Sequence, residues 1–198
     1  MTTAALVLAG GTATRLGGGD KPLLEVGGTP MLARIIDRLR PDASAIAISA
    51  NGDPARFAAF GLAVLPDGAF AGQGPLAGVL AGLDWAAGTG AEALLTIPGD
   101  TPFVPAGLAA ILAPPPACAT SAGRMHHLVA LWPVACRDAL RGLLSAPGSR
   151  AVGRFADLIG MRRVDFPAAK WDRFLNVNTL DDLAAARGLA SRAKEGQP

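Results

Sequence analysis

Short apolar runs recur along the chain and predict strands that are buried on both faces. None of them alternates polar and apolar residues, as a strand with one solvent-exposed face does. The predicted strands cover residues 4–9, 45–50, 62–66 and 92–98. Two segments with helical periodicity lie between them, at residues 30–40 and 75–87, and each opens with a proline, which is favoured at a helix start.

The order of short strands and helices predicts an α/β fold, with three layers (α/β/α) around a mostly parallel, twisted sheet. Residues 1–190 form a single domain in this interpretation, and the polar tail 191–198 is expected to fray. The proline-rich stretch 112–119 is expected to be a connection. In open sheets of this kind, ligands bind beyond the carboxyl ends of the strands. The candidate site therefore involves the loops after Ala9, Ala50, Pro66 and Pro98.

Composition narrows the class of protein. The chain has 198 residues, of which 51% are hydrophobic and 17% charged, so it can bury one sizeable core. Its formal net charge of +2 is too small to indicate a nucleic-acid-binding surface. Cys118 and Cys136 belong to no CxxC pattern or Cys/His cluster, so we expect buried, reduced thiols in a cytoplasmic protein. We expect neither a membrane span nor export.

The loop after the first predicted strand, "LAGGTATRLGGGDK", combines bare backbone with two cations. A glycine-rich turn at the end of a buried strand offers backbone N–H groups to a phosphate. The GxxxxGK[ST] pattern of a Walker A loop and the GxGxxG of a dinucleotide site are both absent. We interpret Gly10, Gly11, Arg15 and Lys21 as a triphosphate cradle, with Arg15 as a forked donor and Lys21 as a point charge. A flexible loop with ordinary surface charges is the alternative.

A carboxylate follows the fourth predicted strand. In "LLTIPGDTPF", Asp100 should emerge on the same rim as the glycine-rich loop. Mg²⁺ typically takes one or two protein carboxylates and completes its coordination with phosphate oxygens and water. Asp100 is therefore the predicted metal ligand. The alternative is a turn residue, or the cap of a helix near Pro105.

The stretch "LAGGTATRLGGGDKPLLEVGGTPML" resembles the signature of nucleotidyltransferases that couple a nucleoside triphosphate to a phosphorylated acceptor. Its "RLGGGDK" variant is most similar to that of the molybdenum cofactor guanylyltransferase family. The segments "GPLAG" (74–78), "PGDTPF" (98–103) and "FLNVNTLDDL" (174–183) agree with it in order, so the resemblance spans nearly the whole chain. It implies a Rossmann-like nucleotidyltransferase fold, with about residues 1–110 binding the nucleotide and about 111–190 binding the acceptor.

The same resemblance implies a reaction. GMP would be transferred from GTP to molybdopterin that carries molybdenum, giving the guanine dinucleotide cofactor and pyrophosphate. Such a reaction needs no protein nucleophile, because the acceptor's phosphate oxygen attacks the α-phosphorus of GTP directly. The expected catalytic residues are those that neutralise charge, namely Arg15, Lys21 and Mg²⁺-bound Asp100.

Carried over by residue, the resemblance implies that the backbone of Leu8, Ala9 and Gly10 meets the base, and that Lys21 contacts phosphates. It further implies that the nucleotide is contacted by Asn51, Asp67 and Asp100. Guanine offers N–H donors and a carbonyl acceptor, which amide and carboxylate groups could read. Which of Asn51 and Asp67 meets the base stays open. Each precedes a glycine, so ordinary turns are the alternative for both.

Candidates for the acceptor side are less specific. Gly74, Pro75 and Leu76 open a helix whose N-terminus suits a phosphate, or they are simply a helix start. Asn176 and Asn178 share one face of an extended stretch and suit a pterin; the alternative is hydrogen bonding within the fold, with Asn178 or Thr179 capping the next helix.

Two adjacent histidines form the other acceptor candidate. Neighbours in a strand point to opposite faces, so His126 and His127 make a poor metal chelate. The resemblance places His126 near the acceptor. His127-Leu128 stands where guanylyltransferases tend to have Pro-Thr, so a contact by that threonine is not carried over.

Two other functions fit parts of the pattern. Cytidylyltransferases acting on molybdopterin or another phosphorylated small molecule share the fold, but tend to begin Ala-Ala-Gly where this chain has Leu8-Ala9-Gly10. A nucleotide-sensing module without catalysis would be expected to have lost Arg15, Lys21 or Asp100. The expected partners are GTP, molybdenum-molybdopterin and, transiently, molybdoenzyme chaperones or other cofactor-biosynthesis proteins. With no tyrosine and few aromatic residues for a stable interface, the chain is expected to be a monomer.

Overall fold

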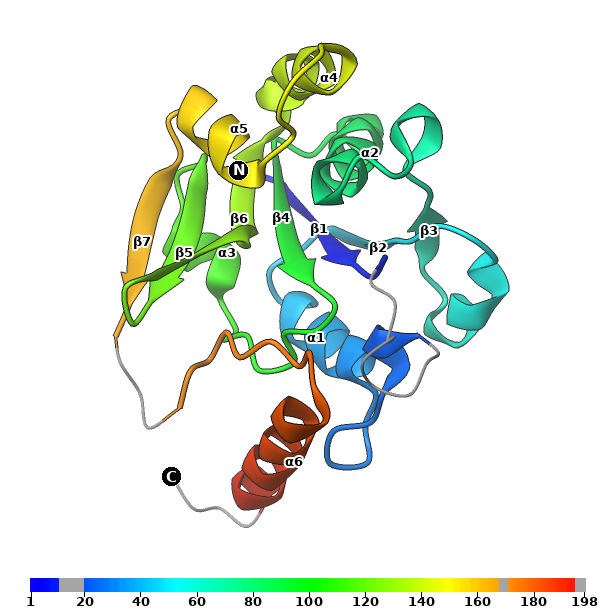
Figure 1. Ribbon diagram of the computed structural model, residues 1–198, viewed down its shortest axis with the longest axis vertical. Coiled ribbons are helices and arrows are strands. Elements are labelled where there is room, and N and C mark those ends of the chain that lie inside the picture. Colours follow the sequence, from blue (N-terminus) through cyan, green and yellow to red (C-terminus); the bar gives the residue numbers. More distant parts are fainter. Residues whose placement is uncertain (11–19, 168–170, 195–198) are drawn as a thin grey trace.

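A continuous sheet runs across the molecule, with helices on both of its faces (Figure 1). The computed structural model describes residues 1–10, 20–167 and 171–194. Within these residues the sheet has seven strands in the order β3-β2-β1-β4-β6-β5-β7. The strands are β1 (Thr3–Leu8), β2 (Ala45–Ser49), β3 (Ala63–Leu65), β4 (Ala93–Pro98), β5 (Ala117–Ser121), β6 (Arg124–Pro133) and β7 (Arg162–Phe166).

The direction of the strands divides the sheet into two parts. β1 pairs in parallel with both β2 and β4, and β2 pairs in parallel with β3. β6 runs antiparallel to its two neighbours, β4 and β5, while β5 and β7 are again parallel. The carboxyl ends of β1 to β4 therefore lie along one rim, as expected for a mostly parallel sheet.

Six α-helices are found in the described ranges, together with short 3-10 turns. The helices are α1 (Met31–Leu39), α2 (Pro75–Gly88), α3 (Leu108–Leu112), α4 (Arg137–Ser145), α5 (Val152–Leu158) and α6 (Leu180–Lys194). The 3-10 turns are η2 (Lys21–Leu23), η3 (Pro54–Phe60), η4 (Gly68–Phe70) and η5 (Val134–Cys136). In Figure 1, α2, α4 and α5 lie on one side of the sheet and α1 and α3 on the other.

Alternate residues of the central strands feed the two cores. On one face, Ala5 and Val7 of β1 pack with the apolar stripe of α1, which buries Leu32, Ile35, Ile36 and Leu39. On the other face, Ala4 and Leu6 pack under α2, whose apolar residues extend around most of the helix. Burial on both faces explains why these strands read as continuous apolar runs. The predicted three-layer α/β fold is thereby confirmed.

A third, smaller core joins the end of the chain to its beginning. Leu183, Ala186 and Ala190 of α6 pack against Val26 and Met31. α6 extends to Lys194, and residues 195–198 lie outside the described part of the chain. The expectation that residues 191–198 fray stays a prediction.

The predicted elements match the structure at most positions. The four predicted strands and both predicted helices are present, and each of their ends lies within one residue of the predicted position. The connection at 112–119 was predicted too long. Its last three residues open β5, because Ala117 and Cys118 pair with β6 on one side and with β7 on the other. The division at about residue 110 into nucleotide and acceptor parts stays a prediction.

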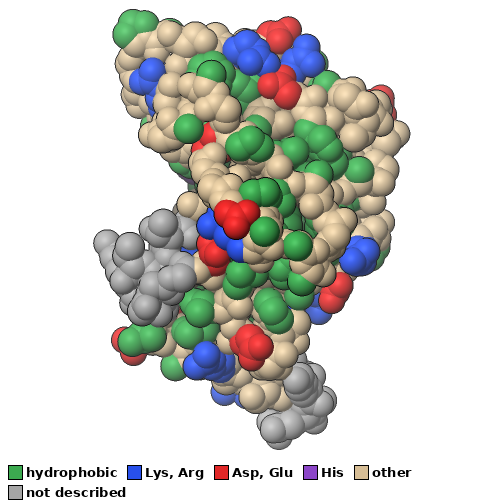
Figure 2. Space-filling model, turned by 90° about the vertical axis from the view of Figure 1, so that its right-hand side faces the viewer, with side chains coloured by type: hydrophobic (Ala, Val, Ile, Leu, Met, Phe, Trp, Pro, Cys, Tyr) green, Lys and Arg blue, Asp and Glu red, His purple; other side chains and the backbone are tan. Residues whose placement is uncertain are grey.

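Burial sets the state of both cysteines. Cys118 and Cys136 are free and buried, as predicted. Burial raises the pKa of the Cys118 thiol, and it raises that of Cys136 to about 11. Across the described residues there is no helix with both the length and the apolar character needed to cross a membrane. Figure 2 shows acidic and basic side chains interspersed on one face of the molecule.

Candidate functional site

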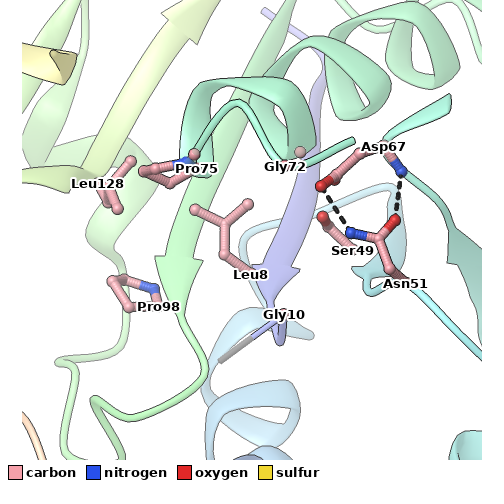
Figure 3. A pocket seen from close by; sticks show the side chains of 11 residues that line it. Leu8, Gly10, Ser49, Asn51, Asp67, Gly72, Pro75, Pro98 and Leu128 are labelled. Atoms are coloured by element: carbon pink, nitrogen blue, oxygen red, sulfur yellow. Dashed lines mark hydrogen bonds between the residues drawn. The ribbon is translucent and has the colours of Figure 1, made fainter. Parts of the chain in front are cut away.

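A cavity of about 460 Å³ opens at the carboxyl rim of the parallel strands (Figure 3). It lies where β1, β2, β3 and β4 end and where α2 begins. Its described lining consists of Leu8, Gly10, Ser49, Asn51, Asp67, Gly72, Gly74, Pro75, Gly78, Pro98 and Leu128. Most of these residues offer backbone or small side chains, so a ligand here would lie close to the main chain. All four loops marked by the sequence meet at this rim.

The strand ends hold the rim in place through backbone hydrogen bonds. The N–H of Ala9 donates to the carbonyl of Ser49 at 2.8 Å, and that of Gly99 donates to the carbonyl of Leu8 at 2.9 Å. The N–H of Ala9 is therefore already used, so a base could meet only the carbonyl of this buried residue. Among the described residues, nothing lies within 4 Å of a Cβ placed on Gly10, which is compatible with the expected close approach of a ligand.

α2 approaches the rim closely at one glycine. A Cβ on Gly78 would lie 2.4 Å from Oγ of Ser49 and 3.2 Å from Cδ2 of Leu8. The first distance is one that real Cβ atoms essentially never show and the second is tight, so a side chain at residue 78 would force Ser49 or the helix to shift. The N-terminus of α2 is thus pressed against the cavity, with Gly74 as its N-cap and Pro75 at its first turn.

Asn51 and Asp67 form a two-point pair on the cavity wall, drawn with dashed lines in Figure 3. Nδ2 of Asn51 donates to Oδ2 of Asp67 at 2.7 Å, and Oδ1 of Asn51 accepts the backbone N–H of Asp67 at 2.9 Å. The two bonds fix the orientation of the amide, because a flipped amide would place two donors or two acceptors together. Among the described residues, no hydrogen bond uses Oδ1 of Asp67.

The predicted cation and the predicted metal ligand contact each other. Nζ of Lys21 lies 2.6 Å from Oδ2 of Asp100 and 2.5 Å from Oδ1 of Asn178. Lys21 is 8% exposed, so the ammonium group is largely removed from water. Both side chains lie beside the main cavity, at a smaller one that shares Leu8 and Pro98 with it.

Two further contacts keep Lys21 beside Asp100. A Cβ on Gly99 would lie 2.9 Å from Cγ of Pro22, so the turn η2 packs directly on the Asp100 loop. The carbonyl of Asp100 accepts the N–H of Val177 at 2.9 Å. This second bond brings the segment before α6 to the site and places Asn178 beside Lys21.

The oxygens around Lys21 define a place that suits a divalent cation. Oδ2 of Asp100 and Oδ1 of Asn178 converge on one positive charge, and carboxylate and amide oxygens are ligands that Mg²⁺ accepts. Among the residues described, no three His, Cys, Asp or Glu side chains gather into a metal site. An ion held by so few protein oxygens must complete its shell with phosphate and water, which is the usual arrangement for Mg²⁺ with a nucleotide.

Arg56 is a site residue that the sequence analysis missed. From η3, it donates to Oδ1 of Asp20 at 2.8 Å and to the carbonyl of Asn51 at 2.5 Å. Its buried Nε has no hydrogen-bond partner among the described residues. Arg56 thus places a positive charge between Asp20 and Asn51. The Pro-Ala-Arg context of residues 54–56 carries no recognisable signal for this role.

The acceptor candidates are distributed over several places. Gly74 and Pro75 line the main cavity, while the side chain of Leu76 is fully buried in the core and leaves only its backbone. His126 and Asn176 line a neighbouring cavity of about 220 Å³. The side-chain oxygen of Asn178 accepts a hydrogen bond from Lys21 instead. That the two asparagines act on one surface stays a prediction. Gly11 and Arg15 lie outside the described residues.

The C-terminal candidates also show how the last helix begins. Oδ2 of Asp182 accepts the N–H groups of Asn178 and Thr179, and the Asp182 N–H returns to Oγ1 of Thr179. This is a capping box with Thr179 as the cap, one of the two residues expected in that role. These hydrogen bonds, led by that from Asn178, lower the pKa of Asp182.

Comparison with known proteins places this site in a family. Residues 5–160 match the family described as MobA-like NTP transferase domain. A molybdenum cofactor guanylyltransferase from Acidiphilium cryptum is 56% identical over 182 residues, which are 92% of this chain and 92% of the relative. One from Rhodopseudomonas palustris is 48% identical, over 96% of this chain and 95% of the relative.

Solved structures agree on the fold. A molybdopterin-guanine dinucleotide biosynthesis protein A from Archaeoglobus fulgidus superposes with a TM-score of 0.72 at 20% identity, covering 96% of this chain and 100% of that one. A 2-C-methyl-D-erythritol 4-phosphate cytidylyltransferase from Thermus thermophilus gives 0.67 at 20% identity, covering 96% and 100%. The chain therefore belongs to the MobA-like NTP transferase family, and it is a nucleotidyltransferase related to the molybdenum cofactor guanylyltransferases.

Proposed function

We propose that this nucleotidyltransferase transfers GMP from GTP to the terminal phosphate of molybdenum-molybdopterin, forming molybdopterin guanine dinucleotide and releasing pyrophosphate. One observation carries the proposal: Lys21 and Asp100 lie together beside a strand-end cavity that is lined by glycines, a few apolar side chains and one amide–carboxylate pair. This arrangement suits a base in the cavity and phosphates at its edge. The names of the closely related proteins support the same reaction.

The Asn51–Asp67 pair supports guanine as the base. Guanine presents adjacent N1–H and N2–H₂ donors, and a carboxylate is an acceptor without hydrogens of its own. Oδ2 of Asp67 accepts a hydrogen bond from Asn51. Asp67 lines the cavity, so its other oxygen, Oδ1, is left to accept a hydrogen bond from guanine. In this proposal Asp67 reads the base and Asn51 holds the carboxylate in position.

In the reaction, an oxygen of the acceptor's phosphate attacks the α-phosphorus of GTP, and the bond between that phosphorus and the oxygen bridging to the β-phosphate breaks. The chain aligns these groups and neutralises charge, and no covalent enzyme intermediate is formed. Lys21, released from Asp100, places its ammonium group on phosphate oxygens, and Arg15 adds a second cation. Asp100 and Asn178 would hold Mg²⁺, which would offset the negative charge of the phosphates. The N-terminus of α2 at Gly74 offers N–H groups to the acceptor's phosphate.

A pyrophosphate-release assay tests the proposal. The purified chain with Mg²⁺ and molybdenum-molybdopterin should release pyrophosphate with GTP and not with CTP. Release with CTP alone would assign it to the cytidylyltransferases, and nucleotide binding without release would make it a sensing module. Asp100→Ala should lower turnover by about a hundredfold or more while leaving the fold intact, since removing one charge-stabilising group has effects of this order. Normal turnover by folded Asp100→Ala protein would contradict the role of Asp100.

A further inference from the structure

His126 lies at one end of a hydrogen-bonded chain that joins two strands to the segment before α6. Oγ of Ser121, at the end of β5, is 2.7 Å from Nε2 of His126. The same hydroxyl donates to Oδ1 of Asp172 at 2.9 Å. Oδ1 of Asp172 also accepts the backbone N–H of Phe174 at 2.9 Å, and the Phe174 ring lies 4.9 Å from the His126 ring. His126 is 7% exposed, so this chain is its main polar environment.

The order of bonds in this chain determines where the proton on His126 lies. A serine hydroxyl has a single hydrogen, and an ionised carboxylate can only accept. Ser121 gives its hydrogen to Asp172, so its oxygen must accept the hydrogen of the imidazole. Nε2 therefore carries the hydrogen, and in the neutral ring Nδ1 carries the lone pair.

Burial favours the neutral form of the His126 ring. It is the largest cause that lowers the pKa of His126, and the positive charge of Arg124 and the neighbouring His127 lower it further, while Asp172 acts in the opposite direction. Among the described residues, no group donates a hydrogen bond to Nδ1. Nδ1 of His126 thus has no partner among these residues, and both His126 and Asn176 line the cavity of about 220 Å³.

We propose that Ser121 and Asp172 are positioning residues, which hold His126 as the neutral Nε2–H tautomer so that Nδ1 accepts a hydrogen bond from the acceptor substrate. The partner of Nδ1 is an N–H or O–H group, because a lone pair repels phosphate oxygens. The cavity beside His126 therefore receives a hydrogen-donating edge of the acceptor's heterocycle, while its phosphate binds toward α2. The amide of Asn176 offers both donor and acceptor groups to the same edge. The assignment of the ligand rests on the proposed function; the assignment of the tautomer does not.

Nuclear magnetic resonance of the nucleotide-free protein tests the tautomer. The chain has only two histidines, so a ¹⁵N-labelled sample of a His127→Gln variant assigns the His126 signals. We expect one neutral tautomer with the hydrogen on Nε2. Ser121→Ala and Asp172→Ala should each give a mixture of tautomers, because Nε2 loses its fixed acceptor in the first and Ser121 is free to donate to it in the second. Ser121→Thr keeps the hydroxyl and should restore the single tautomer.

Steady-state kinetics test the consequence for the substrate. Ser121→Ala should raise the KM for the molybdopterin acceptor by about three- to tenfold, the effect of losing one ordered hydrogen bond, with little change in kcat or in the KM for GTP. Ser191→Ala is the matched control, since its hydroxyl bonds only within α6 to the carbonyl of Arg187 among the described residues. That variant should behave as the wild type.

The outcomes separate the two proposals. A wild-type His126 with its hydrogen on Nδ1, or a Ser121→Ala variant that keeps the wild-type tautomer, would overturn the positioning role whatever the reaction is. An unchanged acceptor KM in a Ser121→Ala variant with mixed tautomers would overturn the contact with the acceptor. Failure of GTP-dependent pyrophosphate release by the wild type would overturn the proposed function and leave the tautomer result standing.

Discussion

The ammonium group of Lys21 donates hydrogen bonds to oxygens of Asp100 and Asn178, which are distant from it in the sequence. These contacts determine what the positive charge of Lys21 does at the site. Its ammonium group occupies the position between Asp100 and Asn178 that a divalent cation would take. A carboxylate that already has a cation binds a second one weakly, because the two positive charges repel each other. Lys21 is therefore expected to exclude free metal from the site until a nucleotide brings compensating negative charge.

The first prediction follows from this competition. Lys21→Met has a side chain of similar length without charge. Mn²⁺ should bind this nucleotide-free variant about tenfold more tightly than it binds the wild type, because the Asp100 carboxylate no longer has to give up its hydrogen bond to Lys21. Electron paramagnetic resonance of free Mn²⁺ measures this affinity. Pyrophosphate release should fall at the same time, by about a hundredfold.

Arg141→Met provides the control for charge. Arg141 donates to both oxygens of Asp84 on the surface between α4 and α2, so its removal changes the net charge by the same amount away from the site. Its Mn²⁺ affinity should equal that of the wild type. Equal Mn²⁺ affinities for Lys21→Met and wild type would show that Lys21 does not compete for the metal position.

At the scale of elements, the turn η2 and the loop after β4 act as one unit because they touch at Gly99. The proline ring of residue 22 packs where a side chain at 99 would be. Lys21 precedes that proline and Asp100 follows that glycine, so the packing sets the distance between the two charges.

Gly99→Ala should therefore impair function more than a typical surface substitution. The added methyl group would lie 2.9 Å from Cγ of Pro22 and 3.2 Å from the Leu8 carbonyl, which must shift. We expect a loss of about 1–3 kcal/mol in the free energy of unfolding, as for overpacking, measured by urea denaturation. The kcat of pyrophosphate release should fall as well, because Lys21 and Asp100 move apart.

Gly142→Ala is the matched substitution. Gly142 lies within α4, and a Cβ there would meet no atom of the described residues within 4 Å outside the helix's own backbone. Alanine favours a helix interior over glycine, so this variant should gain about 0.5–1 kcal/mol and keep full activity. A Gly99→Ala protein as stable and active as Gly142→Ala would mean that the contact with Pro22 has no effect on the site.

The sequence predicted the parallel half of the sheet well for a physical reason. Residues 4–9 and 92–98 belong to strands buried on both faces, and such strands require continuous apolar runs. The exposed edge strand β7 (Arg162–Phe166) lacks this pattern, with charged residues at three of its five positions, and so it was not predicted. The antiparallel direction of β6 follows from the short turn Ala122-Gly123 that joins it to β5, and hydrophobic periodicity does not encode such a turn.

The sequence could predict those site residues that come directly after a strand. Asp100 and Asn51 follow buried strands, so their place on one rim could be inferred. Lys21 and Asn178 are separated by 157 residues, and only the fold brings them together. Arg56 was missed because a lone arginine in a 3-10 turn looks like any solvated charge. Hydrogen bonds of this kind become visible only when the backbone path is known.

On the scale of the whole molecule, the two cysteines report on global unfolding. Cys118 and Cys136 belong to the core between the sheet and α2, α4 and α5. The reactive form of cysteine is the thiolate, and burial holds the pKa of Cys136 at about 11, well above neutral pH.

Both thiols should therefore resist modification until the core opens. At pH 7.5 the native protein should react with a chromogenic disulfide reagent far more slowly than the same protein in concentrated urea, where both thiols should react. The fraction of modified thiol should follow the urea transition measured by circular dichroism. Rapid reaction of either thiol in native protein would mean that this core opens locally without global unfolding.

The cytoplasmic location, the monomeric state and transient contact with molybdoenzyme chaperones stay predictions.

The sheet and the site are completed by different parts of the chain. Every strand of the described sheet ends before residue 167, whereas Asp172, Asn176 and Asn178 follow it. A spectrum dominated by strands and helices is therefore a poor measure of competent enzyme. A preparation that had lost the chain from residue 172 onward would still show the β signal of the sheet, yet it would have lost the Asn178 oxygen beside Lys21. Before any activity measurement, the protein should therefore be checked by its intact mass and not only by its secondary-structure spectrum.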